Sequence, residues 1–279
     1  MAKLFIVGTP IGNMNDMTLR AIDTLRAVDV VACEDTRHSL PLLAKYDVHA
    51  KLIAYHKFNE QEASDKIIAL IAEGKNVAII TDAGMPSISD PGAEVIAKCR
   101  EQGVETELVP GPTAFASAIT LSGIKAQGFT FLGFLPEKTA DKKALVARVK
   151  GTGLPIVLYC APHDLGKTAK FLFEELGDRN VHVVRELTKM HECVEDTTLA
   201  DFHAEERGEI VLIIDASSAE NPLLSLSVEE HLRHYLALGY DQKSAVKAVA
   251  SDRALPKNEV YQVAINMQPT SPTSPTSLD

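Results

Sequence analysis

The chain has 279 residues, of which 46% are hydrophobic and 24% are charged, a composition typical of a globular protein long enough for two domains. No stretch approaches the roughly 20 uninterrupted apolar residues of a membrane-spanning helix, so no membrane association is expected. A net charge of −10 argues against a nucleic-acid partner, because phosphate backbones are bound by Lys and Arg, and by itself favours a small-molecule enzyme.

Short apolar runs alternate with helical patterns over the first 125 residues. The first run has only four apolar residues, whereas a secretory signal needs about 7–15, so it is interpreted as a buried strand. Continuous β-branched runs separated by helices indicate strands buried on both faces, and hence a parallel, doubly wound sheet. We expect an N-terminal α/β domain over residues 1–123, with strands at Leu4–Val7, Val28–Cys33, Lys51–Tyr55, Val77–Thr81 and Glu105–Val109.

A second α/β domain is expected over residues 124–225, with its main helix at Asp164–Leu176. Two of its strands, Val181–Arg185 and Cys193–Thr197, lie too close in the chain for a helical crossover, so its sheet should be mixed. The other strands are expected at Phe129–Gly133, Ile156–Cys160 and Ile210–Asp215.

The chain is expected to end in a small helical extension over residues 226–267 and a disordered tail over residues 268–279. Asp241 can cap a helix that Pro256 ends. The tail consists largely of Pro-Thr-Ser repeats and has almost nothing to bury. The predicted fold class is therefore α/β, with two α/β domains and this helical extension.

Three turns rich in Gly and Pro follow the first, fourth and fifth strands, at Gly8–Asn13, Asp82–Gly92 and Pro110–Ala116. Ligands of open α/β sheets bind beyond the carboxyl ends of the strands, so these turns should form one rim. Glycine permits close backbone approach and proline fixes the turn. Any single turn can simply connect a strand to a helix, but three at neighbouring strand ends favour a binding site.

The composition of this rim restricts its ligand. The sequence has neither the Gly-x-Gly-x-x-Gly pattern of dinucleotide sites nor a Gly-x-x-x-x-Gly-Lys-Ser/Thr phosphate loop. The rim holds small apolar residues and no cluster of Lys or Arg, which suits a nucleoside without a phosphate chain. The four cysteines are scattered without a Cys-x-x-Cys pair and indicate reduced thiols in a cytoplasmic protein, and no metal is predicted.

Four segments, Val7–Asn13, Cys33–Arg37, Thr81–Pro86 and Val109–Pro112, occur in an order and spacing that resemble the tetrapyrrole-methylase-like superfamily. More narrowly, the chain resembles the branch of that superfamily that 2′-O-methylates a cytidine of 16S rRNA. The resemblance extends to Arg185–Glu192 and to Leu255–Tyr261 and so covers nearly the whole chain before the tail.

This resemblance implies S-adenosylmethionine in the cleft between the two α/β domains, and a cytoplasmic homodimer acting on 16S rRNA or the small ribosomal subunit. The family often has methionine where this chain has Cys160, a departure that a small polarizable thiol can still accommodate beside adenine. The cofactor residues carried over by position are Pro10, Gly84, Met85, Ser87, Thr113 and Ala114 from the first domain, and Tyr159, Cys160 and Leu187 from the second.

Two polar clusters after buried strands are candidates for catalysis, Asp35 with Arg37 and Glu186 with Lys189. A carboxylate beside Arg37 should stay ionised and orient the ribose, while Lys189 offsets charge on the developing alkoxide. A structural ion pair with a helix cap explains Asp35 and Arg37 equally well.

The helical extension is electrically neutral although the chain is acidic, so it is a candidate RNA-binding surface; a solvated helix face is the alternative. Two other functions stay open. A methyltransferase of a corrinoid or porphyrin precursor would share the cofactor rim, and a non-catalytic ribosome-binding factor would have kept only the fold. The residues expected to contact RNA are Lys243, Lys247, Arg253 and Lys257.

Overall fold

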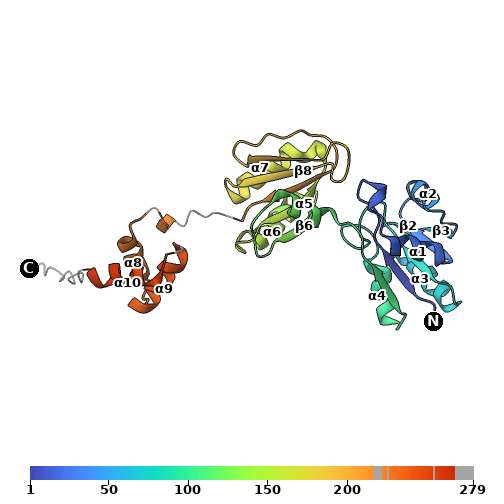
Figure 1. Ribbon diagram of the computed structural model, residues 1–279, viewed down its shortest axis with the longest axis horizontal. Helices are drawn as coiled ribbons and strands as arrows, with labels where there is room; N and C mark the ends of the chain where they lie inside the picture. The colour runs from blue at the N-terminus through green and yellow to red at the C-terminus, as the bar shows by residue number, and fades with distance from the viewer. Residues whose placement is uncertain (217–221, 225, 254, 268–279) are drawn as a thin grey trace, which may run out of the picture. The chain divides into compact units, whose positions relative to one another are not determined.

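The computed structural model describes residues 1–216, 222–224, 226–253 and 255–267. The chain divides into two compact units, Met1–Ala216 and Ser217–Asp279. The larger unit contains two five-stranded sheets with helices on their faces, which confirms the predicted α/β class (Figure 1). The predicted tail, residues 268–279, lies outside the described residues.

The first sheet is entirely parallel, with the strand order β3-β2-β4-β1-β5. Alternate residues of its strands enter two separate cores, because successive side chains point to opposite faces of a sheet. One face packs against α3 and α4, and the other against α1 and α2. The elements are β1 Leu4–Val7, α1 Leu19–Ala27, β2 Val30–Cys33, α2 Thr36–Lys45, β3 Lys51–Ala54, α3 Glu60–Ala72, β4 Val77–Ile79, α4 Ala93–Glu101 and β5 Thr106–Val109, with a 3-10 turn, η1, at Met14–Asp16.

The second sheet is mixed, with the strand order β6-β7-β10-β8-β9, and only the β6–β7 pair is parallel. Its two strands that are too close for a crossover, β8 and β9, pair antiparallel, as predicted. The elements are α5 Ala114–Ser122, β6 Thr130–Phe134, α6 Thr139–Lys150, β7 Ile156–Cys160, η2 Pro162–Asp164, α7 Leu165–Leu176, β8 Asn180–Arg185, β9 Cys193–Thr198 and β10 Ile210–Ile214.

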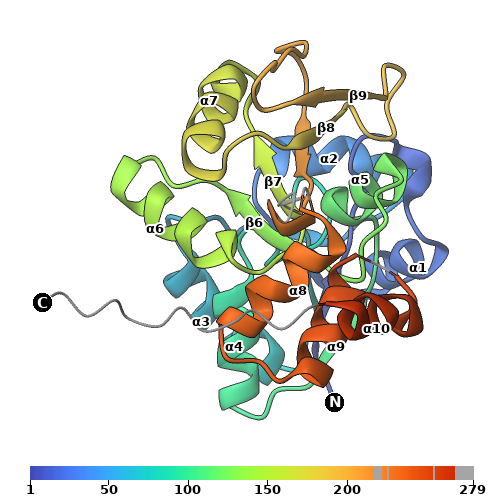
Figure 2. The same ribbon diagram turned by 90° about the vertical axis from the view of Figure 1, so that its left-hand side faces the viewer.

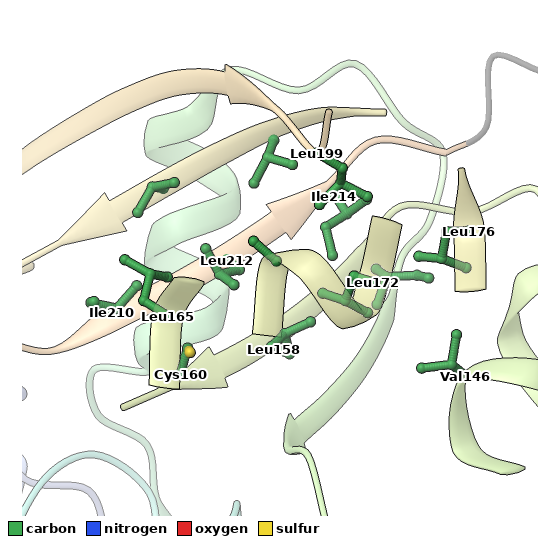
Figure 3. Packing of buried hydrophobic residues seen from close by; sticks show 14 residues of the cluster. Val146, Leu158, Cys160, Leu165, Leu172, Leu176, Leu199, Ile210, Leu212 and Ile214 are labelled. Atoms are coloured by element: carbon green, nitrogen blue, oxygen red, sulfur yellow. The ribbon is translucent and has the colours of Figure 1, made fainter. Parts of the chain in front are cut away.

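The central strand of this sheet, β10, is buried on both faces. Ile210, Leu212 and Ile214 face a core that contains Leu165 and Leu172 of α7, and Figure 3 shows these side chains gathered between sheet and helix. Helices α6 and α7 lie on this side, whereas α5 lies on the other side (Figure 2).

Helix α5 joins the two halves of the larger unit. It follows β5 of the first sheet, yet its Ala118 is fully buried in a core with Val157, Val184 and Ile213 of the second sheet. Ile11, from the turn after β1, belongs to the same core. The two sheets are therefore fastened together by apolar packing beside the turns at the carboxyl edge of the first sheet.

In its described residues the smaller unit contains three helices, α8 Val228–Ala237, α9 Gln242–Asp252 and α10 Lys257–Asn266, with a 3-10 turn, η3, at Pro222–Leu224. Leu232, Val249 and Val260 form its core. The predicted cap is present, because Asp241 Oδ1 accepts a hydrogen bond of 2.7 Å from the backbone N–H of Ser244. Within the described ranges, none of the helices combines the length and the apolar character that crossing a bilayer demands.

Candidate active site

The turns after β1 and β4 are joined by backbone pairing. Thr9 N–H donates to the carbonyl of Gly84 at 2.9 Å, and Gly84 N–H donates to the carbonyl of Thr9 at 3.2 Å. The hydroxyl of Thr9, which is fully buried, also donates to the carbonyl of Thr81 at 3.1 Å. Buried polar groups with these partners hold a loop in one conformation, so the two turns form a rigid pair.

The turn after β5 closes the rim through a contact between glycines. A Cβ on Gly8 would lie 2.6 Å from the backbone nitrogen of Gly111, a separation that real Cβ atoms do not show. The N–H of Gly111 donates to the sulfur of Met85 at 3.3 Å. Gly84 has a φ of 80°, in the left-handed region that favours glycine. The three turns predicted to share one edge thus touch one another.

A cavity of about 390 Å³ lies beside this rim, within the range of roughly 300–1,000 Å³ that is usual for small-molecule sites. Both halves of the larger unit contribute to its walls. The first half supplies Ile11, Asp82, Ala83, Gly84, Met85, Ile88, Ser89, Asp90, Thr113 and Ala114, and the second supplies Phe134, Tyr159, Cys160, Ala161, Pro162, Leu187, Gly208, Glu209, Ile210 and Val211.

Aromatic rings form one wall of the cavity. Tyr159, at the end of β7, lies 5.4 Å from Phe134 and 5.0 Å from Phe131 between ring centroids. Burial raises the pKa of the Tyr159 hydroxyl and of the Cys160 thiol, so both groups are uncharged at neutral pH. This wall offers neutral and mostly apolar ring surfaces that are inclined to one another, and such surfaces suit a nucleoside base.

The charged residues in the lining, Asp82, Asp90 and Glu209, are all acidic. Glu34, at the end of β2, is close enough to raise the pKa of Asp90, after the larger effect of burial. A cavity with this charge attracts a cation and repels a phosphate chain. Sequence reasoning did not single out Asp82, Asp90 or Glu209, since acidic residues in turns are usually helix caps or solvated groups.

The chain matches the family model of tetrapyrrole (corrin/porphyrin) methylases over residues 3–203. It belongs to this family. It is 40% identical to a Bacillus subtilis protein named ribosomal RNA small subunit methyltransferase I, over 94% of the chain and 93% of the relative. A protein of Synechocystis with the same name is 37% identical, over 96% of the chain and 99% of the relative.

Solved structures share the fold at low sequence identity. A cobalt precorrin-4 methyltransferase of cobalamin biosynthesis superposes with a TM-score of 0.57 and 22% identity, over 76% of this chain and 94% of that one. A diphthine synthase gives a TM-score of 0.61 and 15% identity, over 76% and 89%. These structures support the two-domain methylase architecture and nothing more specific.

Methylases of this family take their methyl group from S-adenosylmethionine, and the cavity fits that cofactor. S-adenosylmethionine is a nucleoside that carries a sulfonium, an ammonium and a carboxylate group but no phosphate. It is a net cation, which matches an aromatic wall and an acidic lining. Seven of the nine predicted cofactor residues line the cavity, while Pro10 and Ser87 lie in the adjoining turns. The seven are Gly84, Met85, Thr113, Ala114, Tyr159, Cys160 and Leu187.

The first predicted catalytic pair, Asp35 and Arg37, does not line the cavity. Asp35 Oδ1 accepts from the backbone N–H of Arg37 at 2.8 Å and so caps α2, while Oδ2 lies 2.7 Å from the guanidinium. These bonds lower the pKa of Asp35 to about 2. The pair therefore has the geometry of a helix cap with a local ion pair, beside Glu34 at the carboxyl edge of the sheet.

The second pair, Glu186 and Lys189, borders the cavity through Glu209. Lys189 Nζ lies 3.0 Å from Glu186 Oε1 and 3.0 Å from Glu209 Oε2, and Glu209 is a lining residue. Glu186 has a φ of 51°, a strained backbone conformation of the kind found at functional sites. A Cβ on Gly12 would lie 2.8 Å from Lys189 Cγ, so the turn after β1 packs directly on this cluster.

The predicted RNA contacts lie in the smaller unit. Lys243, Lys247 and Lys257 are exposed there. Arg253 is half-buried and donates to His231 Nδ1 at 3.1 Å and to the carbonyl of Leu223 at 2.8 Å, so its guanidinium serves the internal packing of the helices.

Within the described part of the chain, no group of three or more His, Cys, Asp or Glu side chains is placed to hold a metal ion.

Proposed function

We propose that this protein transfers the methyl group of S-adenosylmethionine to the 2′-hydroxyl of a cytidine in 16S rRNA, within the small ribosomal subunit. The observation that carries the proposal is the cavity with an acidic lining, in a chain whose relatives along nearly its full length are named small subunit rRNA methyltransferases. A ribosomal substrate also supports a cytoplasmic place of action.

The cavity contributes to the reaction by positioning the methyl donor relative to the acceptor oxygen. When bound, S-adenosylmethionine supplies a methyl group already activated on a sulfonium sulfur, so the protein has mainly to align the acceptor oxygen. Such alignment is worth roughly 7–11 kcal/mol in well-oriented reactions. The aromatic wall at Tyr159 and the glycine contacts of the rim are rigid elements on which that alignment can be built.

The cluster of Glu186, Lys189 and Glu209 is proposed to act on the acceptor side. Burial lowers the pKa of Lys189, but the hydrogen bonds that its ammonium donates to Glu186 and Glu209 outweigh burial and leave the pKa raised. Lys189 is therefore an ammonium at neutral pH and can offset negative charge as it develops on the ribose oxygen. Asp35 and Arg37, which do not line the cavity, are proposed to orient the ribose from the carboxyl edge of the first sheet.

An exposed aromatic surface supports an RNA substrate despite the acidic chain. Phe58, in the loop after β3, is 85% exposed, and Lys57 Nζ lies 4.9 Å from its ring centroid. The Asn59 side chain accepts from the backbone N–H of His56 at 2.8 Å and fixes this loop. Unpaired RNA bases stack on aromatic rings of this kind, and binding by stacking needs few contacts with phosphates.

Transfer of a radioactive methyl group from S-adenosylmethionine tests the function directly. The acceptors are small ribosomal subunits that lack the modification, naked 16S rRNA and a tetrapyrrole precursor. We expect label on one cytidine of 16S rRNA, in a dinucleotide resistant to alkaline cleavage because its 2′-oxygen is blocked. Label on the tetrapyrrole would contradict the proposed substrate, and no binding of S-adenosylmethionine in calorimetry would contradict an enzymatic role.

The family resemblance also supports a homodimer. Sedimentation equilibrium of the purified full chain should then give about twice the mass of 30.2 kDa, and a single-chain mass would contradict this part of the proposal.

A further inference from the structure

The loop Met85–Gly92, between β4 and α4, is held in a strained conformation. Ser87 and Ser89 both have a φ of 66°, in the left-handed region that side chains with a Cβ rarely adopt. The backbone N–H of Ser87 donates to the carbonyl of Pro91 at 3.2 Å and closes the loop. Strain of this kind persists only where the surrounding structure enforces it, and it concentrates at functional sites.

The second sheet fixes the position of this loop. A Cβ on Gly133 of β6 would lie 2.9 Å from Ser89 Oγ, so strand and loop are in direct contact. The next residue, Asp90, is half-buried and lines the cavity. Its charge also acts on Tyr159, which is another lining residue. Asp90 thus lies at the cavity on a loop that both halves of the larger unit hold in place.

Asp90 differs from the other two carboxylates of the lining in having no hydrogen-bond or ion-pair partner in the described part of the chain. Asp82 lies 3.2 Å from His38 Nδ1, and Glu209 lies 3.0 Å from Lys189 Nζ. No hydrogen bond or ion pair within the described ranges engages the carboxylate of Asp90. A carboxylate that is neither neutralised nor hydrogen-bonded keeps its oxygens available to a proton donor in the cavity.

The groups that face Asp90 favour proton exchange near neutral pH. Burial is the largest influence, and the like charges of Glu34 after β2 and Asp82 after β4 add to it, which raises the pKa of Asp90 to about 6. Tyr159 at the end of β7 is neutral, and burial raises its pKa further. A general base is most effective when its pKa lies near the working pH.

We propose that Asp90 is a catalytic residue that accepts the proton of the ribose 2′-hydroxyl during methyl transfer. The inference rests on the proposed function. The bond between the 2′-oxygen and the methyl carbon forms as the carbon–sulfur bond breaks, and the hydroxyl proton moves to a carboxylate oxygen of Asp90. The neutral Asp90 then returns its proton to solvent. Asp35 is unsuited to this task because Arg37 holds its pKa at about 2.

The primary test compares the pH profiles of single-turnover methylation of small subunits by the wild type, Asp90→Asn and Asp90→Glu. For the wild type we expect the rate to fall about tenfold per pH unit below an apparent pKa near 6. Asp90→Asn should lose about 10²–10⁴-fold in rate and lose this acid limb, and Asp90→Glu should restore part of both. The affinity for S-adenosylmethionine, measured by calorimetry, should change less than tenfold.

A second measurement needs no turnover. In the protein labelled with ¹³C at aspartate carboxyls, one resonance should titrate near pH 6 and be missing in Asp90→Asn. In Glu34→Gln the same resonance should titrate at lower pH, because one like charge has been removed. The acid limb of the methylation rate should move in the same direction.

The outcomes separate the two proposals. If the wild type methylates subunits and Asp90→Asn keeps its rate or its acid limb, Asp90 is not the proton acceptor. The same conclusion follows if the variant loses activity only through weaker binding of S-adenosylmethionine. If the folded wild type binds S-adenosylmethionine but methylates no RNA, the proposed substrate is wrong, and the role of Asp90 toward a ribose falls with it.

Discussion

Gly8 and Gly111 lie in backbone contact, since a Cβ on either glycine would come within 2.6–2.8 Å of backbone atoms of the other. This contact joins the turns after β1 and β5 at the point where the sequence predicts a common rim. The contact also explains why both turns need glycine, because a side chain at either position would collide with the backbone of the other turn.

Gly8→Ala should therefore weaken the cofactor site. Overpacking at such a contact costs about 1–3 kcal/mol, so we expect the affinity for S-adenosylmethionine to fall on the order of 10–100-fold. Isothermal calorimetry measures the change. Gly151→Ala is the matched control, because a Cβ there meets nothing within 4 Å and the φ of −89° suits any residue. Equal affinities in the two variants would show that the glycine contact does not shape the cavity.

Lys189→Ala should lower methylation while leaving cofactor affinity nearly intact. The ammonium lies 3.0 Å from Glu209, and its removal leaves the carboxylates of Glu186 and Glu209 without their shared cation. A developing alkoxide beside them is then destabilised, and we expect roughly 10²-fold slower single-turnover methylation. Lys75→Ala removes a similar ion pair on the surface, with Glu73, and should leave the rate unchanged. Unchanged turnover in Lys189→Ala would remove this cluster from the mechanism.

Asp35→Asn separates a catalytic role of this residue from its role as a helix cap. Asparagine caps a helix about as well as aspartate, so the free energy of unfolding should change little at pH 7. The negative charge beside Arg37 is lost, and if it orients the ribose, methylation falls while S-adenosylmethionine still binds. Asp35→Ala loses both the cap and the charge. Full activity in Asp35→Asn together with lower stability in Asp35→Ala would leave the residue only its structural role.

Much of the fold could be predicted because its strands are buried on both faces. Continuous runs such as Val30–Cys33 and Ile210–Ile214 have no amphipathic alternative, so their boundaries fell within a few residues of the predicted ones. Helix α6 was not predicted, because Val146 is its only fully buried side chain among the described residues and its sequence shows little periodicity. The packing of α5 on the second sheet also had no sequence signal, since its apolar residues suit either sheet.

The candidate site was predicted better on the cofactor side than on the acceptor side. Glycines and prolines mark the rim, since backbone approach restricts the residue type at positions such as Gly84. The acidic lining depends on contacts between segments far apart in the chain, which spacing does not reveal. Asp90 precedes Pro91, and this sequence context suggests a helix cap. In the structure α4 begins at Ala93 with Gly92 as its N-cap, and burial together with the charges of Glu34 and Asp82 raises the pKa of Asp90.

Asp90 should also lower the free energy of unfolding of the protein at high pH. A carboxyl whose pKa rises from 3.8 to about 6 on folding binds its proton more tightly in the folded state. The stability that this raised pKa contributes is fully present below about pH 4 and is lost as the pH rises through 6. Relative to the wild type, Asp90→Asn should therefore gain more stability at pH 8 than at pH 4. The difference in the free energy of unfolding should be about 1 kcal/mol once solvent screening is allowed for.

Urea denaturation of the wild type and Asp90→Asn at the two pH values measures this difference. Asp23→Asn, an exposed change on α1, is the control and should alter stability equally at both. A variant that is less stable than the wild type at pH 8 would contradict the prediction, because it would mean that the charged form of Asp90 stabilises the folded protein.

The exposed lysines of α9 test whether the smaller unit binds RNA. Lys243 and Lys247 are one helical turn apart and both exposed, so they present two charges on one face. If both contact phosphates, Lys243→Ala with Lys247→Ala should weaken binding of small subunits and reduce the slope of log affinity against log salt by about 2. Lys66→Ala with Lys75→Ala, on and just after α3, removes the same charge from the other unit and is the control. Equal affinity and equal salt slopes in the two double variants would leave α9 a solvated helix face, because a general loss of positive charge acts alike wherever it occurs.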